Sequence, residues 1–165
     1  MTKSKLILGL IVIVLVAFGA GYFISHHHKA GPISQNNSTY VSKGKTVDLS
    51  GQQLTTLPES VLNQTDITNL NLSNNQLTSL PAGISKLTNL QILNVENNRL
   101  VTLPAEIGQL KKLQTADFSN NRLTSLPPQL GNLTQLKSLK LSGYKGSPRD
   151  IEQLKTMLPN TQIRS

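Results

Sequence analysis

The sequence predicts an α/β solenoid with a parallel sheet of about five strands, preceded by one N-terminal transmembrane helix. The solenoid follows from a repeat, because leucine, asparagine and Leu-Pro positions recur at one fixed interval between Leu70 and Leu133. A fixed period of about 23 residues is the signature of stacked structural repeats. The transmembrane helix follows from an uncharged apolar segment near the N-terminus. The predicted parts are a basic N-terminus (1–5), a transmembrane signal anchor (6–24), a flexible linker (25–44), the repeats (45–146), and a C-terminal capping helix with a last strand (147–165).

The apolar segment from Leu6 to Ile24 contains no charged residue. A helix of this length spans about 28 Å at about 1.5 Å per residue, close to the hydrocarbon thickness of a bilayer. Lys3 and Lys5 precede it and favour a single-pass topology in the cell membrane with the repeats outside. A signal peptide cleaved after Ala17-Phe18-Gly19 is the alternative, and it would give a secreted protein. The apolar run continues past that site, which favours the anchor; reversed topology would give a tethered intracellular scaffold.

Each repeat begins with a short strand whose apolar and polar residues alternate. In the repeat that starts at Leu70, Leu70 and Leu72 point to one side of the strand and Asn71 points to the other. One repeat cannot bury its apolar side alone, so stability depends on contacts between neighbouring repeats. Leu-Pro pairs such as Leu80-Pro81 lie on the returning arm, where proline restricts the backbone of both residues. The return is therefore predicted to be extended or a short helix.

An asparagine follows the strand in each of three successive repeats, at positions 75, 98 and 121. A short amide can both donate and accept hydrogen bonds, so it can satisfy backbone groups that the turn leaves unpaired. We predict that Asn75, Asn98 and Asn121 form a buried structural ladder and do not bind a ligand. Gln52 and Tyr144 occupy the matching positions of the first and last repeats. Terminal repeats are expected to depart from the pattern, because one side of each faces water.

The residues after Tyr144 predict a cap for the C-terminal end of the solenoid. Ser147 and Pro148 are typical of the first positions of a helix. Ile151, Leu154 and Leu158 then share one face at helical spacing and can cover the open core. A helix that binds a partner is the alternative interpretation.

The pattern L-x-x-L-x-L-x-x-N-x-L, followed by LPxxIxxL, resembles the leucine-rich repeat family in its variety with a period of about 23 residues. The resemblance covers about Lys45 to Ser165. The capping helix resembles the ending of bacterial members of the family, so the whole chain resembles a small, bacterial-like, membrane-anchored member. The resemblance implies a curved solenoid that binds partners, usually proteins, on its concave sheet.

Composition excludes several classes of function. The formal net charge is +8, but positions 1–45 hold five lysines and no acidic residue. Such an arm is attracted to anionic membrane surfaces, whereas an aromatic content of 4% does not favour nucleic-acid binding. The chain has no cysteine, and its only histidines are three consecutive residues, His26 to His28, which cannot converge on one metal ion. No catalytic set can be assembled from the repeats, so we predict a protein that is not an enzyme and has no cofactor.

Two surfaces are candidate binding sites. The first is the concave face, where polar side chains point away from the core and Trp and Tyr anchors are lacking. Its predicted contact residues are Asn71, Ile92, Asn94, Glu96, Asp117 and Lys140. The second is a basic edge formed by Arg99, Arg122 and Lys145, which suits an acidic partner or an anionic polymer.

The predicted function is binding of an unidentified protein or surface polymer outside the cell membrane. The alternative from another class is a structural envelope spacer. In a spacer, the polar concave residues could be changed freely, whereas loss of Leu6 to Ile24 would abolish function.

Overall fold

The computed structural model describes residues 44–165. The predicted basic N-terminus, transmembrane segment and nearly all of the predicted linker lie outside the described residues. Among the helices of residues 44–165, none is long and apolar enough to cross a membrane.

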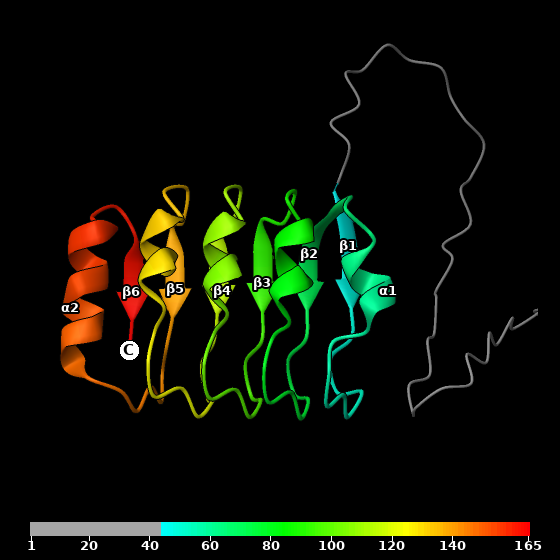
Figure 1. Cartoon of the computed structure of the whole chain (residues 1–165), viewed down its shortest axis with the longest axis horizontal. Coiled ribbons are helices and arrows are strands. Elements are labelled where there is room, and N and C mark those ends of the chain that lie inside the picture. Colours follow the sequence, from blue (N-terminus) through cyan, green and yellow to red (C-terminus); the bar gives the residue numbers. More distant parts are fainter. Residues whose placement is uncertain (1–43) are drawn as a thin grey trace, which may run out of the picture. The chain divides into compact units, whose positions relative to one another are not determined.

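Six strands form one parallel sheet in chain order (Figure 1). They are β1 (Lys45–Asp48), β2 (Ile67–Asn71), β3 (Ile92–Asn94), β4 (Thr115–Asp117), β5 (Ser138–Lys140) and β6 (Gln162–Arg164). The parallel solenoid predicted from the repeat period is confirmed: the repeats supply five strands, and the last strand predicted after the capping helix is the sixth. The additional strand is β6, which pairs with β5 through Leu139 and Ile163. It is parallel because a helix carries the chain back to the same end of the sheet before β6 begins.

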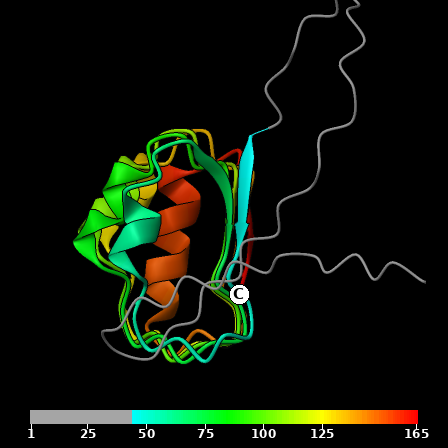
Figure 2. The ribbon, with the colours of Figure 1, turned by 90° about the vertical axis from the view of Figure 1, so that its right-hand side faces the viewer.

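The returning arms are short helices, each of which begins directly after a proline. They are α1 (Glu59–Leu62), η1 (Ala82–Lys86), η2 (Ala105–Gln109) and η3 (Pro128–Asn132). Each preceding proline has an extended backbone, as at Pro81 with φ −71° and ψ 151°. Figure 2 shows these helices on one side and the strands on the other, with the core between them. Buried leucine and isoleucine side chains fill that core, including Leu70, Leu93 and Ile107.

Buried asparagines join each repeat to the one before it. The Nδ2 atom of Asn98 donates to the carbonyl oxygens of Leu72, Val95 and Glu96 at 2.9, 3.1 and 3.2 Å. Its Oδ1 atom accepts a hydrogen bond from the N–H of Leu77 at 3.0 Å. Asn75 and Asn121 make the same four bonds one repeat earlier and one repeat later. Each side chain therefore satisfies backbone groups of two repeats that no strand or helix would pair.

The residue before each ladder asparagine turns the chain. Asn74, Asn97 and Asn120 have φ values of 58°, 56° and 55°, in the left-handed region. Glycine takes the same position in the terminal repeats, with φ 67° at Gly51 and 84° at Gly143. Asparagine and glycine tolerate this conformation better than other residues. In each Asn-Asn pair, the first asparagine therefore makes the turn and the second links the repeats.

The ladder ends at Tyr144, which contacts the cap. Its hydroxyl donates a hydrogen bond to the carboxylate of Asp150 in α2 (Pro148–Met157). Burial raises the pKa of the Tyr144 hydroxyl, and the neighbouring Asp150 carboxylate raises it further. Ser147 caps α2, since its side chain accepts a hydrogen bond from the N–H of Arg149 at 3.2 Å. On the inner face of α2, Ile151 and Leu154 are buried against the core cluster and close its C-terminal end.

We expect Asn98→Ala to lower the free energy of unfolding by about 2–4 kcal/mol, because it leaves buried backbone groups of two repeats unpaired. Asn132→Ala is the matched control. Its side chain is exposed and makes no hydrogen bond within residues 44–165. Urea unfolding of both variants measures the difference, and equal losses of stability would contradict the role assigned to the ladder.

Candidate functional site

The concave face is the sheet surface that points away from the core, and its central column is fixed by hydrogen bonds to the backbone. The strand register aligns Asn71, Asn94, Asp117 and Lys140 side by side. The Oδ1 atoms of Asn71, Asn94 and Asp117 each accept a hydrogen bond from the N–H two residues later, at 3.1, 3.0 and 3.0 Å. These Asx turns end each strand. They also fix the orientation of both amides, so that the Nδ2 donors of Asn71 and Asn94 have set directions and remain for a ligand.

Asp117 is less accessible than the sequence indicates. It is 7% exposed, and its Oδ2 atom lies 2.9 Å from Nζ of Lys140. Burial by itself would raise the pKa of the Asp117 carboxyl, but hydrogen bonds from Lys140 and from Ser119 hold its pKa below the ordinary value. The accessible negative charge near the centre of the face therefore belongs to Glu96, which is half-buried and accepts a hydrogen bond from Asn120 at 3.4 Å.

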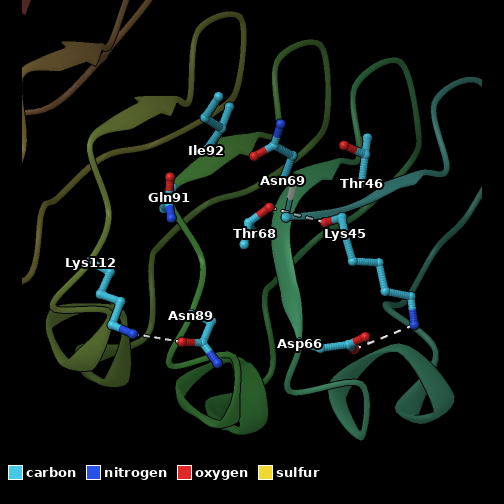
Figure 3. Close-up of a pocket in the computed structure, with 10 residues that line it drawn as sticks. Lys45, Thr46, Asp66, Thr68, Asn69, Asn89, Gln91, Ile92 and Lys112 are labelled. Atoms are coloured by element: carbon cyan, nitrogen blue, oxygen red, sulfur yellow. Dashed lines mark hydrogen bonds and ion pairs between the residues drawn. The ribbon is translucent and has the colours of Figure 1, made fainter. Parts of the chain in front are cut away.

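A groove opens beside the concave face at the start of β1, β2 and β3 (Figure 3). It has a volume of about 1070 Å³. Its lining residues are Gly44, Lys45, Thr46, Asp66, Thr68, Asn69, Asn89, Gln91, Ile92 and Lys112. Of these, sequence reasoning named only Ile92 as a contact residue. The repeat period could have indicated that Asp66, Asn89 and Lys112 lie side by side, because they are separated by the same interval as the strands.

Hydrogen bonds hold the rim of this groove in place. Nζ of Lys112 donates to Oδ1 of Asn89 at 2.7 Å, and Nδ2 of Asn89 donates to the carbonyl oxygen of Thr65 at 2.9 Å. At the other end, Nζ of Lys45 lies 3.4 Å from Oδ1 of Asp66. Figure 3 shows the two lysines at opposite ends of the groove. Ile92 lies on the strand side, and 42% of its surface is exposed.

The basic edge follows the loops after the strands. Arg99, Arg122 and Lys145 occupy equivalent places, because their N–H groups bond to Leu77, Leu100 and Leu123, each one repeat earlier. All three side chains are exposed, and none forms an ion pair within residues 44–165. The edge therefore presents three cations in a row, spaced by about 4.8 Å per repeat.

Two family models match the chain: one described as "Leucine rich repeat" at residues 88–144, and one described as "Leucine Rich repeats (2 copies)" at residues 65–106. A solved structure of a leucine-rich repeat protein from Leptospira interrogans is similar, with a TM-score of 0.66 and 43% identity. The chain belongs to the leucine-rich repeat family. The similarity covers 68% of this chain but only 29% of the Leptospira chain. No curated protein matches the chain.

Leucine-rich repeat proteins are typically binding modules without enzymatic activity, and their domains generally bind other proteins. Within residues 44–165, no three His, Cys, Asp or Glu side chains gather where they could hold a metal ion. The histidines at positions 26–28 lie outside the described residues. The concave face and the groove beside it are therefore the surfaces on which a binding function can be tested.

We expect Asp117→Asn to destabilise the fold by about 1–3 kcal/mol at pH 7, because the Asx turn is kept while the charge opposite Lys140 is lost. The pKa of Asp117 is lower in the folded chain than in the unfolded chain, so its ionised form stabilises the fold above about pH 4. This contribution disappears as the pH falls through the folded-state pKa. The difference between variant and wild type should therefore narrow below about pH 4.

Thermal unfolding between pH 2 and pH 8 measures this difference. Glu152→Gln is the control, because Glu152 pairs with Lys155 on the exposed face of α2 and both side chains are more than half exposed. An exposed pair contributes little, so the control should follow wild type. A pH-independent loss in Asp117→Asn would contradict the electrostatic explanation.

Proposed function

We propose that this chain is a membrane-anchored, non-enzymatic protein whose repeats bind another protein outside the cell membrane. The uncharged segment Leu6 to Ile24, with Lys3 and Lys5 before it, supports the anchor and the outward orientation. The observation that carries the binding function is the concave face, with its oriented amide donors at Asn71 and Asn94 and the exposed Ile92 beside them.

The concave face combines features that suit a protein partner. The amides of Asn71 and Asn94 need no rearrangement to donate to a ligand, because the backbone already holds their Oδ1 atoms. Such preorganisation reduces the entropy lost on binding. Ile92 gives this polar surface an apolar contact, and the other residues in its strand column, such as Asn69 and Thr115, are polar. Protein interfaces combine apolar contacts with polar groups around them, and Ile92 with its polar neighbours provides both.

A surface polymer is the second candidate, and the basic edge favours it. Arg99, Arg122 and Lys145 form a line of cations without ion pairs in the described part of the chain, which a flexible polyanion could follow. Their attraction to such a polymer would fall steeply with added salt. The described concave face offers no comparable row of cations. A protein partner would therefore contact the strands, whereas a polyanion would contact the loops that follow them.

Site-specific photo-cross-linking in intact cells tests this proposal. The photoreactive side chain is placed at Ile92 or Asn94 on the concave face of the full chain, and at Arg122 on the basic edge. We expect a discrete adduct with one protein from both concave positions, because a docked partner lies within reach of neighbouring columns. Adducts only from Arg122, and with polymer, would favour the second candidate.

Val101 is the matched control position, because it is 47% exposed and apolar like Ile92 but does not lie on a strand. It should give no adduct with the same protein. Equal adducts from Val101 and Ile92, or none from either concave position, would contradict binding by this face and favour a structural spacer.

A further inference from the structure

The groove beside the concave face contains one charge that no described acidic residue neutralises. Lys45 faces Asp66, so these two charges largely offset each other. Lys112 has only the neutral side-chain oxygen of Asn89 as its hydrogen-bond partner within the described residues. No carboxylate within residues 44–165 forms an ion pair with it. An ammonium group has three N–H donors, so two remain for a ligand, and an anionic ligand group would gain most from them.

The wall between the two lysines offers groups that suit a polypeptide. The side-chain amides of Asn69 and Gln91 make no hydrogen bond within the described part of the chain, and each has a donor and an acceptor. A peptide backbone presents the same two functions at every residue. Ile92 adds an apolar contact at 42% exposure, which an apolar side chain would cover and a purely polar polymer would not.

The dimensions also fit a short peptide. Lys45 belongs to β1, and Lys112 lies just before β4, so the groove extends across about three strand spacings, or about 14 Å. An extended peptide rises about 3.3 Å per residue, so about four residues fill that length. A volume of about 1070 Å³ is sufficient for such a segment.

We propose that this groove binds a short extended segment of the protein partner, with an acidic side chain at Lys112 and an apolar side chain on Ile92. The segment lies across the strands and contacts Asn69 and Gln91 through its backbone. This inference rests on the proposed protein-binding function and adds the chemistry of what is bound. It extends the binding surface to residues at the N-terminal ends of the strands.

Peptide selection on the purified full-length protein tests this inference. The probe is a displayed library of random seven-residue peptides, followed by synthesis of an enriched peptide and titration by fluorescence anisotropy. We expect enriched sequences to share an Asp or Glu a few residues from an aliphatic residue. Lys112→Ala and Ile92→Ser should each weaken binding about tenfold, since both contacts are central to the complex.

The chain offers a matched control for each variant. Lys111 is adjacent to Lys112, but its Nζ donates to the carbonyl oxygen of Asn132, and it does not line the groove. Val101 matches Ile92 in exposure and also lies outside the groove. Lys111→Ala and Val101→Ser should bind the peptide as wild type does. Replacing the acidic residue of the peptide by its amide should abolish the difference between Lys112→Ala and wild type.

Three results would overturn the inference: no enriched peptide, enriched peptides without an acidic residue, or equal losses in Lys111→Ala and Lys112→Ala. Photo-cross-linking at Asn94 remains a separate measurement of the proposed function. A discrete protein adduct at Asn94 together with any of these results would leave the binding function in place and reject only the acidic segment.

Discussion

The asparagine ladder is the interaction on which the other features of the structure depend. Asn75, Asn98 and Asn121 each pair backbone groups of their own repeat and of the preceding one, so successive strands stay in register at a shift of one repeat. That register places equivalent side chains in straight columns on the concave face and in the groove. Asp66, Asn89 and Lys112 precede their strands, and this column becomes a continuous surface because the repeats are in register. The ladder ends at Tyr144, β6 adds one further strand to the columns, and α2 closes the core.

The sequence was sufficient to predict the fold because its signal is periodic. The apolar alternation, the Leu-Pro pairs and the fixed repeat period all indicate the same parallel solenoid. The exceptions are positions where one residue type serves two purposes. Asn74 and Asn75 are the same residue type, yet Asn74 has a left-handed backbone, whereas Asn75 is buried and its side chain makes four hydrogen bonds. The last strand, β6, carries no repeat motif, and it was predicted from the cap that follows the repeats and not from their period.

The binding surface was harder to predict, because exposure and hydrogen bonding decide it. Any polar residue on the concave side of a strand is a candidate contact by sequence, but Asp117 is buried against Lys140 and its oxygen closes a turn. Conversely, Lys112 and Gln91 precede their strands and belong to no strand motif, although they line the groove. Comparing Lys112 and Gln91 with the residues at the same positions of neighbouring repeats could have placed them in this groove, because a column consists of equivalent positions in successive repeats. The repeat period is therefore enough to predict the fold, whereas the exposure and hydrogen bonds of each column are needed to predict the site.

We propose that the repeats are displayed outside the membrane on an anchored chain. Limited trypsin treatment of intact cells, followed by mass spectrometry of the released and membrane-bound fragments, tests it most directly. We expect cleavage after Lys29 or Lys43, release of the repeats into the medium, and a membrane-bound remainder that contains Leu6 to Ile24. Repeats that stay intact until the cells are lysed would show the opposite topology. Absence of any membrane-bound remainder, with a mature chain that begins near Ala20, would instead show a secreted protein.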